Sequence, residues 1–151
     1  MNIKILIING PNLNLLGSRE TSLYQTLTLE EVIGLARDYK YEKPVKIDHF
    51  QSNHEGDIIE RIHSSRSNYD LLILNAGALT HYSIAIRDAL LAVRIPFAEV
   101  HITNIFAREE FRHKSVTADL AFCVIAGAGA LSYSLAIIAG LDLMAKKNKT
   151  A

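Results

Sequence analysis

Glu99 and His101 are the residues of this chain whose types and spacing point most directly to chemistry. They stand two positions apart in a short apolar segment, and residues two apart on a β-strand project from the same face. A carboxylate beside an imidazole selects one tautomer of the ring and raises its basicity, which makes the histidine a general acid or base near neutral pH. An ordinary buried ion pair is the alternative interpretation of this spacing.

Arg19 and Tyr24 form a second candidate pair. A tyrosine normally loses its proton near pH 10. A guanidinium within about 4–6 Å lowers that pKa by roughly 1–3 pH units, which would make the phenolate available as a base. The spacing alone favours a solvated arginine and a packing tyrosine. Both residues lie between Gly10 and Leu27, a long strand-to-helix connection that predicts a lid.

His81 stands where a helix is predicted to begin, and the unpaired N–H groups of a helix N-terminus bind anions. A capping or core histidine is the equal alternative. His81, Glu99 and His101 lack the spacing typical of a metal site, which needs three or four convergent ligands, so no metal is expected. Gly127–Gly129 precedes a helix, but Ser132 replaces the third glycine of a dinucleotide loop. Close helix–strand packing is therefore favoured over a cofactor.

Apolar runs and helical periods alternate along the chain and supply the elements that must position these side chains. Runs typical of strands cover residues 3–8, 45–50, 71–74, 97–102 and 120–126. Helical patterns cover residues 29–39, 57–66, 82–93, 105–111 and 130–146. Thr28 and Glu31 form a capping box that opens the first helix. The predicted inward face of residues 82–93 comprises Ile84, Ile86, Ala89, Leu90 and Val93.

This alternation predicts an α/β fold in which a parallel sheet lies between two helical layers. We expect a flavodoxin-like three-layer sandwich with strand order 2-1-3-4-5. In such sheets a ligand binds beyond the carboxyl ends of the strands, near the switch between the first and third strands. Polar residues follow four strands: Asn9, Asn12 and Asn14, then residues 52–55, then Asn75, Thr80 and His81, and finally Glu99, His101, Thr103 and Asn104. We therefore predict the functional site at this edge.

The composition excludes several classes of protein. The chain has 151 residues, of which 16 are basic and 16 acidic. This size fits one catalytic domain over residues 1–151, and a neutral chain has no field to hold nucleic acid or an anionic membrane. Met1–Lys4 is not typical of a signal peptide, and no apolar run reaches the roughly 18 residues that span a membrane. We expect a cytoplasmic protein whose single cysteine, Cys123, is a buried structural thiol.

Several blocks of sequence resemble type II 3-dehydroquinate dehydratases. They are Asn9–Gly17 followed by Arg19-Glu20, then Gln51–Gly56, Glu99–Ile102 with Asn104, and Ala107–His113. The likeness is collinear and covers nearly the whole chain. It implies a flavodoxin-like fold, a dodecamer built from trimers, and no cofactor. The implied reaction converts 3-dehydroquinate to 3-dehydroshikimate through an enolate and without a Schiff base. Such a lyase serves the shikimate pathway, which leads to chorismate and aromatic amino acids, or quinate catabolism.

The resemblance also assigns the first chemical step. Tyr24 would be the base, with Arg19 and Arg108 lowering its pKa. Asn12 would hold a water that stabilises the enolate. A water near Asp88 is the alternative proton acceptor, and Asp88 would reach the site of a neighbouring subunit.

His101 would protonate the departing hydroxyl group, and Glu99 would orient it. The remaining groups implied by the resemblance bind the substrate: Asn75, Thr103 and the backbone of Ile102 at its carboxylate, and His81 and Arg112 at its ring hydroxyls. The chain departs from the family pattern where Thr103 replaces serine, Gln25 glycine, Ala76 proline, Lys114 histidine, and Leu131-Ser132 Gln-Gly. None of these changes removes a chemical group named above.

A binding module on the same fold is the alternative function, either an FMN protein or a phosphorylation receiver domain. A flavin loop after the first strand should be rich in serine, threonine and glycine that cradle phosphate, but this chain has Pro11–Leu16 there. A receiver domain should end its third strand in aspartate, whereas this strand ends at Asn75.

Overall fold

The computed structural model describes residues 2–18 and 26–150, and its centre is a parallel sheet. The strands are β1 (Ile3–Asn9), β2 (Val45–Gln51), β3 (Leu71–Asn75), β4 (Phe97–His101) and β5 (Cys123–Ala126). They lie in the order β2-β1-β3-β4-β5, which confirms the predicted flavodoxin-like topology. From β1 to β2 the chain moves one way along the sheet, and from β2 to β3 it moves the other way, so right-handed crossovers place the connecting helices on opposite faces.

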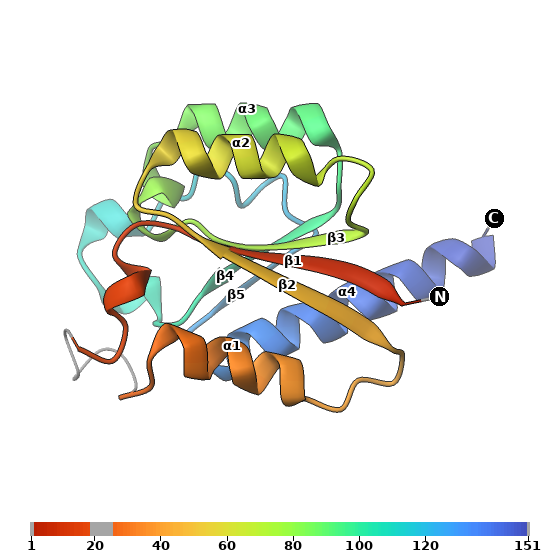
Figure 1. The fold of residues 1–151 in the computed structure, drawn as a ribbon. Coiled ribbons are helices and arrows are strands. Elements are labelled where there is room, and N and C mark those ends of the chain that lie inside the picture. The colour runs from red at the N-terminus through yellow and green to blue at the C-terminus, as the bar shows by residue number, and fades with distance from the viewer. Residues whose placement is uncertain (1, 19–25, 151) are drawn as a thin grey trace.

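The helices cover both faces of the sheet (Figure 1). They are α1 (Leu29–Asp38), α2 (Glu55–Ser65), α3 (Ile84–Val93) and α4 (Leu131–Thr150). Helices α2 and α3 lie on one face, and α1 and α4 lie on the other. The side chains of β1 alternate between the two layers: Ile5 and Ile7 pack with α1 and α4, whereas Leu6 and Ile8 pack with α2 and α3. A strand buried on both faces reads as a continuous apolar run, which is why it was predictable.

The helix starts follow from local capping. The backbone N–H of Glu31 donates to Thr28 Oγ1 over 3.3 Å, and the Thr28 N–H donates to Glu31 Oε2 over 2.7 Å, so the predicted capping box is confirmed. Helix α3 begins two residues later than predicted because Ser83 Oγ caps it by accepting the Ile86 N–H over 3.0 Å. Ile84 lies on the side of α3 opposite the buried Ile86, Ala89 and Leu90, and its 56% exposure corrects its predicted inward position.

Two apolar segments differ from their predicted structure. Residues 120–122 belong to no strand: the Thr117 carbonyl accepts the Leu120 N–H in a turn, and Leu120 packs against the α2–α3 layer, so β5 starts only at Cys123. The predicted helix over 105–111 is two short 3₁₀ helices, Ile105–Ala107 and Glu110–Arg112. Cys123 is half-buried, not fully buried as expected. Among the described residues no helix is both long and apolar enough to cross a membrane.

Candidate active site

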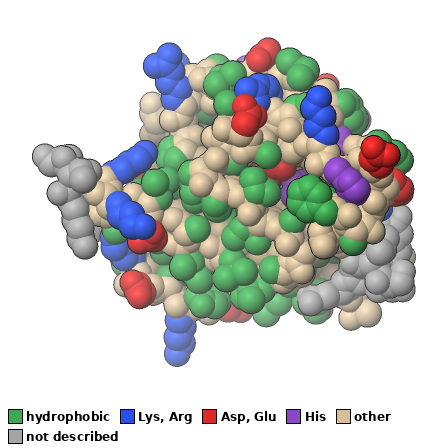
Figure 2. Space-filling model, turned by 180° about the vertical axis from the view of Figure 1, so that it is seen from behind, with side chains coloured by type: hydrophobic (Ala, Val, Ile, Leu, Met, Phe, Trp, Pro, Cys, Tyr) green, Lys and Arg blue, Asp and Glu red, His purple; other side chains and the backbone are tan. Residues whose placement is uncertain are grey.

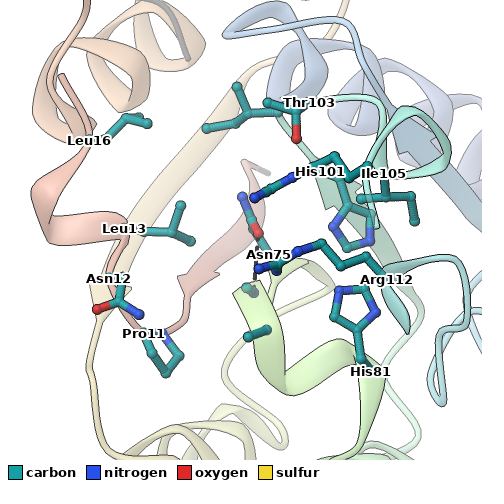
Figure 3. A pocket seen from close by; sticks show the side chains of 14 residues that line it. Pro11, Asn12, Leu13, Leu16, Asn75, His81, His101, Thr103, Ile105 and Arg112 are labelled. Carbon is teal, nitrogen blue, oxygen red and sulfur yellow. Dashed lines mark hydrogen bonds between the residues drawn. The ribbon is translucent and has the colours of Figure 1, made fainter. Parts of the chain in front are cut away.

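A pocket lies beyond the carboxyl ends of β1, β3 and β4, at the edge that the sequence predicts. Its walls include these residues with predicted roles: Asn12, Asn75, His81, His101, Ile102, Thr103, Arg108 and Arg112. Figure 3 shows His101, Arg112 and His81 on one wall and Asn12, Leu13 and Leu16 on the opposite wall, with Asn75 between them. The pocket therefore sets a guanidinium and two imidazole groups against a wall that is apolar except for Asn12.

Glu99 and His101 are paired at the end of β4, as their spacing predicts. His101 Nε2 lies 2.7 Å from Glu99 Oε1, and the two side chains are 7% and 1% exposed. His101 lines the pocket, whereas Glu99 is not one of its lining residues. With Nε2 bonded to the carboxylate, Nδ1 is the ring nitrogen not engaged by Glu99.

Three hydroxyl groups complete the surroundings of Glu99. Thr80 Oγ1 donates to Oε1 over 3.1 Å, while Ser115 Oγ and Thr117 Oγ1 donate to Oε2 over 2.9 and 2.7 Å. Burial raises the pKa of Glu99, but the hydrogen bonds from His101, Thr117 and Ser115 outweigh burial and lower it overall. The carboxylate is therefore ionised at neutral pH and holds the Nε2–H tautomer of His101.

Ser115 and Thr117 were missed from the sequence. They lie in the segment before β5, and Arg87 of α3 holds that segment: its Nη1 donates to the Val116 carbonyl over 2.8 Å and its Nη2 to Asp119 Oδ2 over 2.9 Å. Ser115 and Thr117 are two positions apart, and this spacing of two hydroxyl groups is the local sequence signal that could have indicated a shared partner. Their contact with Glu99 depends on tertiary packing.

The cationic wall is held by contacts outside the pocket. His81 Nδ1 donates to the Lys114 carbonyl over 2.7 Å. His81 ends the 3₁₀ helix Gly77–His81 and does not begin α3, so its predicted place at a helix N-terminus is wrong. Arg112 Nε donates to Glu109 Oε2 over 2.8 Å. Glu109, also missed from the sequence, thereby orients Arg112 beside the pocket.

The loops after β1 and β3 meet at the floor of the pocket. The Gly10 N–H donates to the Asn75 carbonyl over 2.8 Å, and a Cβ at Gly10 would lie 2.3 Å from the Ala76 carbonyl oxygen. Only glycine permits this approach. Asn12 has a φ of 68°, and its N–H donates to Asn53 Oδ1 over 2.9 Å. This close contact sets Asn12 and Asn75 on the same pocket.

Gly127–Gly129 packs the loop after β5 against the end of β4, in line with the packing interpretation. The Gly127 N–H donates to the His101 carbonyl and the Gly129 N–H to the Ile102 carbonyl. A Cβ at Gly127 would lie 3.2 Å from Asn104 Cβ. Within the described part of the chain, no three His, Cys, Asp or Glu residues are grouped so as to hold a metal ion.

Comparison with known proteins identifies the family. A family model described as Dehydroquinase class II matches residues 3–141. Catabolic 3-dehydroquinase 2 of Neosartorya fischeri is 56% identical over 133 residues, which cover 88% of this chain and 89% of the relative. The 3-dehydroquinate dehydratase of Photorhabdus laumondii is 47% identical over 144 residues, with 95% and 96% coverage. The crystal structure of type II dehydroquinase from Butyrivibrio crossotus superposes with a TM-score of 0.89 at 44% identity, with 93% and 98% coverage.

The chain belongs to the class II dehydroquinase family. Dehydration of 3-dehydroquinate to 3-dehydroshikimate is the activity that follows from this membership. The match decides against the flavin-binding and receiver-domain alternatives.

Some residues predicted to act in this dehydroquinase lie away from the described pocket. Arg19, Tyr24 and the departure at Gln25 fall outside the described residues. Asp88 is exposed on α3 and does not line the pocket. Of the other departures from the family pattern, Thr103 keeps its hydroxyl on the pocket wall, and Ala76 is 1% exposed in the core.

Proposed function

We propose that this pocket dehydrates 3-dehydroquinate through an enolate, with His101 as the acid of the second step. The buried Glu99–His101 pair, which presents its imidazole to the pocket, is the observation that carries the proposal. A base removes the proton beside the ketone, and the electron pair left behind forms the enolate. When the enolate collapses, the hydroxyl group leaves with its bonding electrons and takes a proton from His101 to form water. Glu99 stabilises the imidazolium that precedes this transfer.

For the first step we propose Tyr24 as the base, with Arg19 and Arg108 favouring its phenolate. Arg108 lines the described pocket, whereas the roles of Arg19 and Tyr24 rest on the sequence resemblance. A water held by Asn12 would donate to the enolate oxygen. A water near Asp88 remains the alternative proton acceptor.

Substrate binding is assigned by the charge of the pocket. The substrate carboxylate would meet the Asn75 amide, the Thr103 hydroxyl and the backbone of Ile102, which lie together beyond β3 and β4. Arg112 would donate to one ring hydroxyl, and His81 would contact another through Nε2, which can accept because Nδ1 donates to the Lys114 carbonyl. Arg112 suits this role because its guanidinium is a planar donor that Glu109 already orients.

We further propose that the protein assembles as a dodecamer, with its twelve subunits arranged as trimers, in which Asp88 completes the site of a neighbouring subunit. Ile84, Asp88 and Leu91 stand at helical spacing on α3; Ile84 and Leu91 are 56% and 49% exposed, and Asp88 is exposed beside them. Hydrophobic side chains also gather on the face seen in Figure 2, and the edge strand β5 exposes Val124. Exposed apolar patches and uncovered sheet edges are typical of subunit interfaces.

The relatives do not single out one metabolic pathway, since their names include catabolic 3-dehydroquinases and a 3-dehydroquinate dehydratase. Both the shikimate pathway and quinate catabolism fit. A cytoplasmic location stays a prediction from the sequence.

The test of this function is direct. We expect added 3-dehydroquinate to yield the ultraviolet absorbance of the conjugated enone product. Borohydride added with the substrate should leave activity and protein mass unchanged, because the enolate route forms no lysine imine. No absorbance change would refute the activity, whereas a lysine adduct with loss of activity would refute the enolate route alone.

A further inference from the structure

Beneath the pocket, four polar side chains from four elements form a single hydrogen-bonded chain. Asn75 Nδ2 lies 2.9 Å from Tyr133 Oη, Tyr133 Oη lies 2.5 Å from Asn9 Oδ1, and Asn9 Nδ2 lies 3.0 Å from His49 Nε2. Asn75, Tyr133 and Asn9 are 4%, 0% and 0% exposed. Of the four, Asn75 lines the pocket. None of the steps proposed above uses the other three.

The sheet register explains how these residues meet. Asn9 and Asn75 are paired at the ends of β1 and β3. Both follow the alternation of Ile7 and Ile73 toward the layer of α1 and α4, where Tyr133 is buried in α4. His49 of β2 faces the same layer, since Ile47 two residues earlier packs there. Buried polar groups are expensive unless each has a partner, and here each of the four side chains has another of the four as a partner.

The three hydrogen bonds that join these four side chains all run in one direction. The Asn75 amide donates to Tyr133, the Tyr133 hydroxyl donates to Asn9 Oδ1, and the Asn9 amide donates to His49 Nε2. At the pocket end, Asn75 Oδ1 accepts the Gly77 N–H over 3.3 Å. A reversed Asn75 amide would set its NH₂ group against that N–H. The orientation seen leaves the second Nδ2 hydrogen for the pocket, where an anion needs a donor.

We propose that Tyr133, backed by Asn9 and His49, is a positioning residue for substrate binding, because it orients the Asn75 amide to donate to the substrate carboxylate. The inference rests on the proposed role of Asn75. Burial raises the pKa of Tyr133, so the phenol stays a donor. The pKa of His49 is lowered overall: burial lowers it most, the charge of Glu30 opposes this, and the charge of Arg37 adds to it. The ring is therefore neutral at neutral pH and accepts the hydrogen bond from Asn9.

Tyr133→Phe is the first test, since it keeps the ring and removes the hydroxyl. Without the hydroxyl the Asn75 amide loses its acceptor, and we expect KM to rise about three- to tenfold with kcat changed less than about twofold. Tyr41→Phe is the matched control: Tyr41 packs against the same core and its hydroxyl donates to the Ala36 carbonyl over 2.8 Å, away from the pocket. Its KM should equal that of the wild type.

A double-mutant cycle separates positioning from simple support of the core. Asn75→Ala alone should raise KM about 10- to 150-fold, because it removes a hydrogen bond to a charged group. In that background Tyr133→Phe should add nothing to KM, since no amide is left to orient. An equal rise in both backgrounds, or an unchanged KM for Tyr133→Phe alone, would overturn the inference. An unchanged KM for Asn75→Ala would instead overturn the proposed role of Asn75.

Substitution of His49 tests the same series of hydrogen bonds from its other end if Tyr133→Phe does not fold. His49→Gln keeps a side-chain acceptor for Asn9, whereas His49→Leu removes it. We expect His49→Leu to raise KM about two- to threefold and His49→Gln to restore most of the wild-type value. Equal KM values for the wild type and His49→Leu would contradict the proposal.

Discussion

Glu99 is a buried carboxylate that accepts hydrogen bonds from His101, Thr80, Ser115 and Thr117, and those from His101, Thr117 and Ser115 lower its pKa. Since hydrogen bonding lowers its pKa below the ordinary value of 4.5, the folded state binds this proton less readily than the unfolded chain. The stabilisation is therefore fully present above about pH 4.5 and is lost as the pH falls through the lower folded pKa.

Thr117→Val removes one of these donors from Glu99. We expect it to cost about 1.5–3 kcal/mol of the free energy of unfolding at pH 7, and kcat to fall about tenfold because a carboxylate with one fixed donor fewer orients His101 less well. The difference in stability from the wild type should shrink at acid pH, as urea titrations at pH 7 and pH 3 would show. Thr117→Ser keeps the hydroxyl and is the matched control. A stability difference that does not change with pH would contradict this account.

At this scale, local spacing predicted Glu99 with His101, because neighbours on a strand share a face. It could not predict Thr117 or Tyr133, whose contacts join elements far apart along the chain. Those contacts exist only once the helices have packed on the sheet.

The loops that follow β1 and β3 are held together by the approach of Gly10 to Ala76. Gly10→Ala would drive a methyl group into a backbone carbonyl, which cannot rotate away. We expect a loss of about 1–3 kcal/mol in stability together with a higher KM, since Asn12 and Asn75 would be moved apart. Thermal unfolding and initial rates measure the two effects.

Gly34→Ala is the control for this substitution. Gly34 lies inside α1, where an added Cβ meets nothing within 4 Å. Alanine there should raise stability by about 0.5–1 kcal/mol and leave KM unchanged. Wild-type KM and stability for Gly10→Ala would show that the two loops are not held as described.

Elements were predicted best where a local signal marks them. The Thr28 capping box located the start of α1, and the continuous apolar run located β1. The apolar run before Cys123 misled because side chains of a turn can also pack in a core. Ile84 misled because it is apolar, although its position on the helix is opposite the face that Ile86, Ala89 and Leu90 define.

For the whole molecule, a parallel sheet between two helical layers follows from the alternation of strands and helices and from the handedness of their connections, which need no homologue. The assembly does not follow from such rules, since a stripe such as Ile84–Asp88–Leu91 indicates an interface but not its symmetry. If Asp88 acts in a neighbour's site, Asp88→Ala and Tyr24→Phe should each be nearly inactive, and their random mixed oligomers should regain about a quarter of full activity. Light scattering should find a multiple of three subunits. A fully active monomer, or mixtures that stay inactive, would refute this arrangement.

The most direct test of the central claim is the turnover number of His101→Ala with 3-dehydroquinate, followed by enone absorbance. His63→Ala, on the exposed side of α2, is the matched control. A positioned acid contributes about 10²- to 10⁴-fold, so we expect His101→Ala to lose that factor in kcat while His63→Ala keeps wild-type activity. A His101→Ala protein that is folded and retains near-normal kcat would contradict the assignment of the Glu99–His101 pair as the proton donor.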